Sequence, residues 1–193
     1  MLGLKLATDP FWVNIAEKTI DEILIDHAYC EQKAASTCIS LIVKYPHKKE
    51  LVDEVTPIVA EEWGHFRKVL KELNLRGFEF GANRSDDYVT ELMKFQRQGG
   101  NEEDRLTDKL LISAMIEARS CERFRLLSLH ISDEKLKTFY HEFMVSEAGH
   151  YRTFLDLAKL YAPEEKVKAR WQEMLEFEAE IMQKRALRGD RMH

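Results

Sequence analysis

Two four-residue strings in this sequence combine residue types that bind metals together. They are Glu62–His65 (Glu-Trp-Gly-His) and Glu147–His150 (Glu-Ala-Gly-His), and each places a carboxylate and an imidazole three residues apart. In a helix this spacing brings both side chains to one face. A single Glu-x-x-His pair would carry little weight, but Gly-His-Phe-Arg in the first copy corresponds to Gly-His-Tyr-Arg in the second. The duplication indicates one kind of site that is built twice.

A further glutamate precedes each string by nearly the same distance. Glu31 lies 31 residues before Glu62, and Glu117 lies 30 residues before Glu147. If each stretch is an antiparallel helical hairpin with its turn near residue 47 or 132, both glutamates of a hairpin lie 15 or 16 residues from the turn. They then share one height along the bundle. We therefore predict six metal ligands in one layer: Glu31, Glu62, His65, Glu117, Glu147 and His150.

This donor set favours iron or manganese. Four carboxylates carry the charge that two divalent cations neutralise, and oxygen-rich ligation with one imidazole per metal suits Fe or Mn better than Zn. Glu122 is excluded from the set because it lies only 10 residues from the turn near residue 132, about 7.5 Å off the layer. The pattern predicts a carboxylate-bridged centre of two metals inside a four-helix bundle.

The sequence predicts that all the segments carrying these ligands are helices. Apolar residues recur at helical spacing, with Asp9-Pro10 as a start signal and Pro46, Gly77 and Gly99-Gly100 as stop signals. The fold class is all-α: a four-helix bundle with one crossover connection, a short crossing helix and a C-terminal helix. We expect a single domain over residues 1–193 with a basic, frayed tail at 184–193. The expected helices cover 9–46, 48–73, 86–98, 102–130, 133–161 and 162–187.

Composition narrows the class of protein. A net charge of −5 excludes a protein that holds nucleic acid by bulk charge alone. No apolar run is long enough to span a membrane, and the first ten residues lack the features of an export signal, so we expect a cytoplasmic protein. Three cysteines without Cys-x-x-Cys spacing read as reduced, buried thiols: Cys30, Cys38 and Cys121.

With these motifs in place, the chain resembles the ferritin-like di-iron carboxylate superfamily, and within it the bacterial tRNA-(2-methylthio-N6-isopentenyladenosine) hydroxylases. The resemblance runs from Pro10 to about Arg188. The ligand pattern is shared by the whole superfamily, whereas the string Glu-Ala-Arg-Ser-Cys-Glu-Arg-Phe is more specific to the hydroxylases. The closest passages are 26–34, 61–66, 116–124 and 146–151.

The resemblance implies an O₂-dependent non-heme di-iron monooxygenase. Its cofactor would be two Fe ions, with O₂ as co-substrate, and it would hydroxylate the isopentenyl group of a hypermodified adenosine next to the tRNA anticodon. One oxygen atom leaves as water, so two electrons must come from an external reductase. The alternative is an iron-handling protein, either a ferroxidase or a rubrerythrin-like peroxidase. The sequence does not distinguish between a monomer and a dimer as the oligomeric state.

Several residues have two readings at this point. His27 lies one turn before Glu31 and is either a support for that ligand or an ordinary, partly exposed histidine. We interpret Trp63, Tyr29 and Tyr151 as core or surface aromatic residues rather than redox relays.

The clusters of basic residues have two interpretations. They are either solvent-exposed faces of helices or contacts to RNA phosphates. They comprise Lys184, Arg185, Arg188 and Arg191 in the tail, Arg67, Lys68 and Lys71 after the first motif, and Arg76, Arg84, Lys94, Arg97 and Arg105 around the crossover.

Overall fold

The computed structural model describes residues 2–82 and 85–193, and helices are the only regular elements in those ranges. The chain forms two compact units. One, the α2/α3 unit, comprises Asn14–Ser85 and Arg188–Met192. The other, the α5/α6 unit, comprises the N-terminal segment through Val13, Asp86–Leu187 and His193. The expected all-α class is confirmed.

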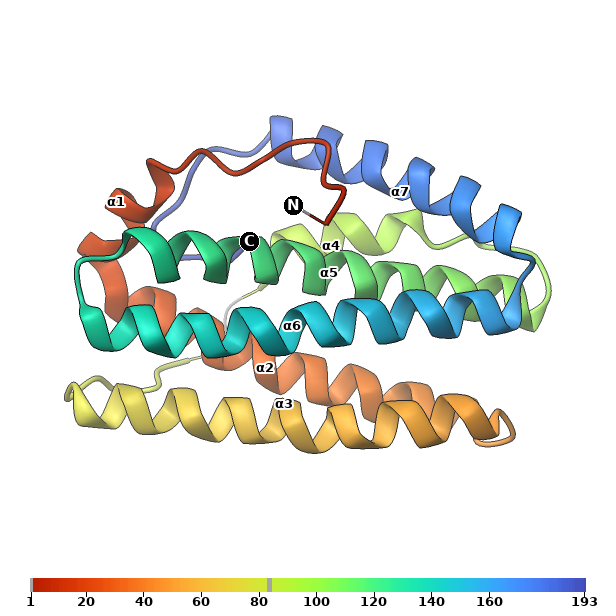
Figure 1. Ribbon diagram of the computed structural model, residues 1–193, viewed down its shortest axis with the longest axis horizontal. Coiled ribbons are helices and arrows are strands. Elements are labelled where there is room, and N and C mark those ends of the chain that lie inside the picture. Colours follow the sequence, from red (N-terminus) through yellow and green to blue (C-terminus); the bar gives the residue numbers. More distant parts are fainter. Residues whose placement is uncertain (1, 83–84) are drawn as a thin grey trace. The chain divides into compact units, whose positions relative to one another are not determined.

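The α2/α3 unit is a helical hairpin. Helix α2 spans Ile20–Lys44 and α3 spans Lys49–Leu75, and Figure 1 shows them as antiparallel neighbours. Helix α3 ends in a Schellman motif, because Gly77 adopts φ +74° and the Phe78 N–H donates to the Leu73 carbonyl at 3.0 Å. The apolar faces meet in a core of Leu24, Ala28, Ala35, Leu41, Leu51, Val55, Ile58, Val69 and Leu73.

One local expectation for this hairpin needs correction. The helix expected from Asp9 to Pro46 is broken into α1 (Trp12–Ala16), a 3-10 turn at Glu17–Thr19, and α2. The break coincides with Thr19, whose φ of −133° and ψ of 49° lie outside the helical region. Pro57 lies inside α3, and its missing N–H predicts a kink or a looser turn about one turn before Glu62.

The α5/α6 unit is a second hairpin with additional helices. Helix α5 spans Glu102–His130 and α6 spans Glu134–Tyr161. Each begins at a side-chain cap: Asn101 forms a capping box with Asp104, and Asp133 accepts from the backbone of Lys135 and Leu136. The short helix α4 (Asp87–Leu92) and α7 (Glu164–Gln183) pack against each other, and α7 also packs on α5.

A buried carboxylate fastens these additional helices to α5. Asp108 is fully buried and accepts from Arg97 Nε and Nη2 at 2.9 and 2.8 Å and from Arg170 Nε at 2.9 Å. Arg170 of α7 also donates to the Phe95 carbonyl at 2.7 Å and lies over its ring. Burial alone raises the pKa of Asp108, but the hydrogen bonds from the two guanidinium groups outweigh it and hold that pKa below 3.8.

The basic tail is packed, so the expectation of a frayed tail is wrong for its last residues. The Met192 N–H donates to Asp26 Oδ2 at 2.8 Å, and Thr19 Oγ1 donates to the Gly189 carbonyl at 2.7 Å. The Met192 side chain is only 1% exposed. Segment 188–192 docks on α2 because the Met192 N–H and the Arg191 guanidinium, 3.6 Å from Oδ1, satisfy the buried carboxylate of Asp26.

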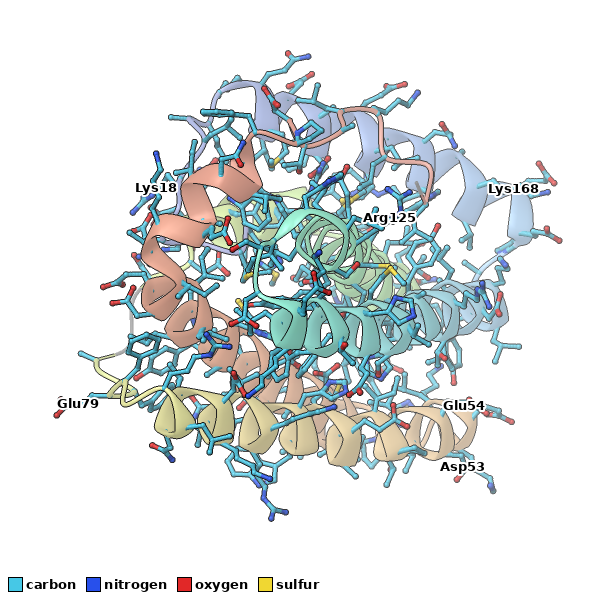
Figure 2. All side chains as sticks on the ribbon, turned by 60° about the vertical axis from the view of Figure 1, so that its left-hand side comes forward. Lys18, Asp53, Glu54, Glu79, Arg125 and Lys168 are labelled. Carbon is cyan, nitrogen blue, oxygen red and sulfur yellow. The ribbon has the colours of Figure 1, made fainter. Side chains whose placement is uncertain are left out.

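Charged side chains cover the outside of both units. Figure 2 labels examples that project outward from the ribbon, among them Lys18 and Glu54 in the α2/α3 unit and Arg125 and Lys168 in the α5/α6 unit. In the described ranges, 2–82 and 85–193, we find no helix with the length and apolar character that crossing a membrane requires.

The Asp108 cluster predicts a pH-dependent loss of stability. Asp108→Asn should lower the free energy of unfolding at pH 7 by about 2 kcal/mol, because charge-assisted hydrogen bonds are lost at a buried site. A carboxylate with a depressed pKa stabilises the fold above its unfolded pKa and stops doing so as the pH falls through its folded pKa. The difference between the two proteins in urea titrations should therefore shrink as the pH falls below the ordinary pKa of an aspartate, 3.8, and vanish below the lower pKa that Asp108 has in the folded protein. Asp156→Asn, at an exposed pair with Lys159, is the control and should change stability by less than about 0.5 kcal/mol.

Candidate metal centre

The α2/α3 unit brings together the first three predicted ligands. Glu31 comes from α2, and Glu62 and His65 come from successive turns of α3. His65 Nδ1 lies 3.3 Å from Glu31 Oε2 and 3.6 Å from Glu62 Oε2. Each residue offers a ligand atom within 4.8 Å of the others. The antiparallel register of the hairpin therefore sets Glu31 opposite the Glu-x-x-His turn, as equal distances from the connection predict.

The α5/α6 unit repeats this arrangement. Glu117 comes from α5, and Glu147 and His150 come from α6. His150 Nδ1 lies 3.4 Å from Glu147 Oε2, and ligand atoms of all three residues lie within 4.8 Å of one another. The four glutamates of the two triplets are each no more than 6% exposed. Each hairpin thus contains two buried carboxylates beside one imidazole, which is buried at His150 and partly exposed at His65.

The chemistry of these clusters fits a divalent metal. Buried carboxylates are costly without compensating positive charge, and carboxylate oxygen with imidazole nitrogen is a common ligand set for Fe and Mn. A metal ion bound by each triplet would receive one nitrogen and several oxygen donors. The described residues therefore fit the group that the sequence pattern predicts, one triplet per unit.

His27 supports the first triplet. Its side chain is fully buried, and its Nε2 lies 2.7 Å from Glu31 Oε1. Because an ionised carboxylate only accepts, Nε2 must carry the proton and donate it. The reading of His27 as a partly exposed histidine is therefore wrong, and the alternative reading, a support for Glu31, agrees with the geometry.

Glu122 is engaged elsewhere, in agreement with its exclusion from the ligands. Its Oε1 accepts from the Thr8 N–H at 3.1 Å, and its Oε2 accepts from Thr8 Oγ1 at 2.7 Å and from Arg119. Arg119 is fully buried and also pairs with Glu178 of α7, Nη2 to Oε1, at 2.7 Å. The sequence indicated none of these partners, because Thr8 and Glu178 are 114 and 56 residues away from Glu122.

The three cysteines are free thiols. Burial, together with the nearby carboxylates of Glu147 and Glu122, raises the pKa of Cys121 to about 12. Its thiol is therefore protonated at neutral pH and donates to the Met144 carbonyl at 3.3 Å. For Cys121 this agrees with the interpretation as a reduced, buried side chain rather than a thiolate ligand. Cys38 is buried as expected, whereas Cys30 is only partly buried.

The proposed phosphate contacts divide into two groups. Seven of the twelve interact within the fold: Arg188 with Asp190, Arg191 with Asp26, Arg76 with Glu72, Lys94 with Glu91, Arg97 with Asp108, Arg105 with the Gly100 carbonyl, and Lys68. Arg84 lies outside the described residues. Four others have no ion pair with a described residue: Arg67, Lys71, Lys184 and Arg185. The tail therefore presents fewer available charges than its composition suggested.

Comparison with solved structures defines the class of this protein. The structure titled "Protein 43 with aldehyde deformylating oxygenase activity from Synechococcus" matches with a TM-score of 0.92 and 32% sequence identity, covering 98% of this chain and 94% of that one. The expected ferritin-like class is confirmed.

Comparison of sequences then gives the family. The chain belongs to the tRNA-(MS[2]IO[6]A)-hydroxylase (MiaE) family, whose model matches residues 2–193. A Pseudomonas putida relative named tRNA 2-(methylsulfanyl)-N(6)-isopentenyladenosine(37) hydroxylase is 40% identical over 157 residues, 81% of this chain and 75% of the relative. A Salmonella typhimurium relative of the same name is 29% identical, covering 93% of this chain and 83% of the relative. The family resemblance seen in the sequence is confirmed, and the iron-handling alternative is not favoured.

The partners of Glu122 predict that it is dispensable for metal binding. Glu122→Gln should leave two metals per chain while lowering stability by about 1–3 kcal/mol, because Arg119 loses a buried charged partner. Glu117→Gln, the matched change one turn and a half earlier, should reduce the metal content below two. Metal analysis with thermal unfolding checks both. Loss of metal from the Glu122 variant only would exchange the roles of the two residues.

The hydrogen bond from His27 predicts weaker metal binding when it is removed. His27→Ala should lower the affinity for Fe(II) by about 10–100-fold, because Glu31 loses the donor that orients it. Competition with a chelator measures this affinity. His130→Ala, at an exposed histidine of α5, is the control. Equal affinities in the His27 variant and the unmodified protein would show that Glu31 needs no such support.

Proposed function

We propose that this protein is an O₂-dependent di-iron monooxygenase that hydroxylates the isopentenyl group of a hypermodified adenosine next to the tRNA anticodon. The observation that carries the proposal is the coincidence of two features. The chain is a member of the tRNA-(MS[2]IO[6]A)-hydroxylase family over residues 2–193, and each hairpin has a Glu-Glu-His cluster whose two glutamates are buried. Family membership supports the substrate, and the clusters support the metal chemistry.

In this proposal six residues hold two iron ions: Glu31, Glu62, His65, Glu117, Glu147 and His150. Bound iron would supply the activation of O₂, which protein side chains cannot carry out alone. The overall reaction consumes O₂, two electrons and two protons, forms one C–O bond at the allylic carbon, and releases the second oxygen atom as water. The electrons come from an external reductase.

The protein's own residues have three tasks in this scheme. The four carboxylates neutralise the metal charge inside the fold. His27 fixes the orientation of Glu31 through its 2.7 Å hydrogen bond, and the helical hairpins hold both clusters on rigid elements. Because the substrate base belongs to a loop, it is free to leave the stack and enter a protein pocket. Since tRNA is processed in the cytoplasm, we place the enzyme there.

The test is oxygenation of modified tRNA by the reconstituted protein. With Fe(II), a reductant and isotopically labelled O₂, tRNA that carries 2-methylthio-N6-isopentenyladenosine should gain one labelled oxygen at that nucleoside, read by mass spectrometry of the digest. His65→Ala and His150→Ala should each lower the metal content below two and the rate by more than about 100-fold, since a direct ligand outweighs its supports. His141→Ala, exposed on α6, is the control.

Two outcomes would contradict the proposal. Full activity and two metals in either histidine variant would show that the ligand assignment is wrong. Rapid oxidation of Fe(II) by O₂ with no oxygen in the nucleoside would favour the ferroxidase alternative.

A further inference from the structure

The outward face of α3 carries a continuous exposed stripe next to the metal ligands. Its members are spaced by three or four residues, which aligns them along one side of the helix. Glu62 and His65 face away from this stripe, so one helix combines ligands on its inner side with an exposed surface on its outer side. The stripe consists of Thr56, Ala60, Trp63, Gly64, Arg67 and Lys71, all of them exposed.

Trp63 is a large aromatic side chain held in place at this surface. It is 49% exposed, and its ring lies 4.9 Å from that of Phe66. Phe66 packs edge-on against Phe80 at 5.6 Å, and Phe80 stacks on Tyr29 at 4.3 Å. The Tyr29 hydroxyl donates to the Gly81 carbonyl. This chain of rings supports one side of the indole and leaves a large part of it accessible.

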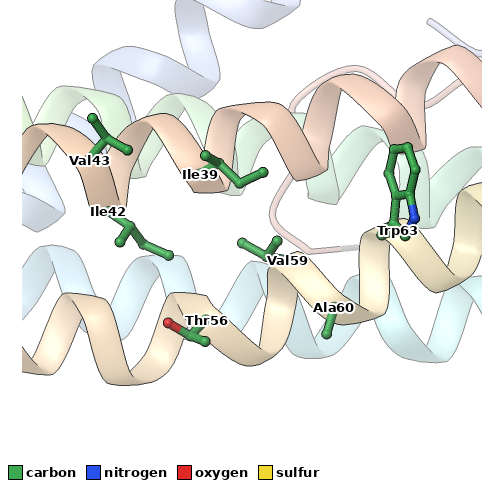
Figure 3. Close-up of a pocket in the computed structure, with 7 residues that line it drawn as sticks. All are labelled: Ile39, Ile42, Val43, Thr56, Val59, Ala60 and Trp63. Atoms are coloured by element: carbon green, nitrogen blue, oxygen red, sulfur yellow. The ribbon is translucent and has the colours of Figure 1, made fainter.

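An apolar groove adjoins Trp63 on the same hairpin. It has a volume of about 520 Å³ and runs between α2 and α3. Figure 3 shows Trp63 standing at one end of the groove, with Ile42 and Val59 directed toward each other further along. Exposed apolar surface of this kind marks an interaction site. The groove alone does not distinguish an RNA base from an apolar side chain of a protein.

Two positively charged side chains without an ion-pair partner among the described residues favour an RNA base over an apolar protein side chain as the occupant of the groove. Arg67 and Lys71 lie one and two turns beyond Trp63, about 6 and 12 Å along the axis, and neither forms an ion pair with a described residue. Glu61 is also exposed, but it lies about 160° around the helix from Trp63 and about 120° from Arg67. An accessible aromatic ring followed by a line of cations is the arrangement that binds single-stranded nucleic acid, in which bases stack and phosphates pair.

We infer that the stripe from Trp63 to Lys71 is the docking surface for the single-stranded loop of the RNA substrate. Trp63 stacks on an unpaired base, and Arg67 and Lys71 contact the phosphates that follow it. This inference rests on the proposed function, because that function supplies the RNA. It also deepens it: the RNA is held on the helix that provides Glu62 and His65, rather than by the basic tail.

Binding of modified tRNA, measured by titration at several salt concentrations, tests this surface. Trp63→Ala should weaken binding about 5–150-fold, the effect of losing one stacked base, whereas Trp63→Phe should retain most of the affinity. Arg67→Gln with Lys71→Gln should reduce the dependence of log K on log salt by about 1.4, the value for two single-strand phosphate contacts. Arg152→Gln with Lys166→Gln, exposed basic residues of α6 and α7, is the matched control and should change neither quantity appreciably.

Gly64 offers an independent steric test. A Cβ atom built at this position meets no atom within 4 Å, so Gly64→Leu is compatible with the fold and improves helix propensity. The larger side chain would stand on the stripe between Trp63 and Arg67. The variant should keep its thermal stability and lose at least tenfold in tRNA affinity.

A comparison of two substrates separates this inference from the proposed function. The ratio of kcat/KM for modified tRNA to that for the free modified nucleoside should fall at least tenfold in the Trp63→Ala and Gly64→Leu variants. If the unmodified protein oxygenates neither substrate, the proposed function is wrong. The binding titrations then still show whether the stripe from Trp63 to Lys71 binds tRNA.

Three results would overturn the inference. The first is unchanged tRNA affinity in the Trp63→Ala and Gly64→Leu variants. The second is a loss of tRNA affinity and salt dependence in the control pair, Arg152→Gln with Lys166→Gln, that equals the loss in Arg67→Gln with Lys71→Gln. A larger loss in Lys184→Gln with Arg185→Gln would count in the same way. The third is a dimer in sedimentation that Trp63→Ala dissociates with no loss of tRNA affinity, which would assign the groove to a second copy of the chain.

Discussion

Burial of glutamates inside helical hairpins is the constraint on which the rest of this structure depends. A carboxylate removed from water needs a positive partner or hydrogen-bond donors, and the chain meets this need in two ways. Asp108 and Glu122 are neutralised by guanidinium groups of the same unit. The glutamates of the two triplets instead share their surroundings with imidazoles. An arginine partner gives a carboxylate a structural role, whereas a histidine and a second carboxylate beside it form the donor set that we propose for a metal ion.

The arginine-based clusters support the triplet of the α5/α6 unit by fixing α5. Arg119 connects α5 to Glu178 of α7 and to the Leu6 carbonyl of the N-terminal segment, and Asp108 connects α5 to α7 and to the segment after α4. Because both anchors lie on the helix that carries Glu117, its position and rotation are set by buried charge pairs in addition to apolar packing. A metal site with narrow distance requirements benefits from such rigid support.

Helix α3 shows how one element serves two purposes through its period. At 3.6 residues per turn, adjacent positions in the sequence face in different directions. Glu62 therefore contributes to the buried cluster while its neighbour Trp63 is half exposed. The surface that we assign to RNA and the residues that we assign to metal are thus held in a fixed relation by the backbone of a single helix.

The sequence alone determined the all-α class, the bounds of α5 and α6 to within a residue, and the proximity of the residues in both Glu-Glu-His triplets that we propose as metal ligands. These features follow from local periodicity, caps and the equal distances of the glutamates from each turn, which depend on positions near one another in the chain. Only the tertiary structure decided that His27 is buried against Glu31, that Glu122 binds Thr8, and that Met192 docks on Asp26. The last two contacts join residues 114 and 166 positions apart. No spacing rule relates such residues, because their proximity arises from packing of whole elements around a buried charge.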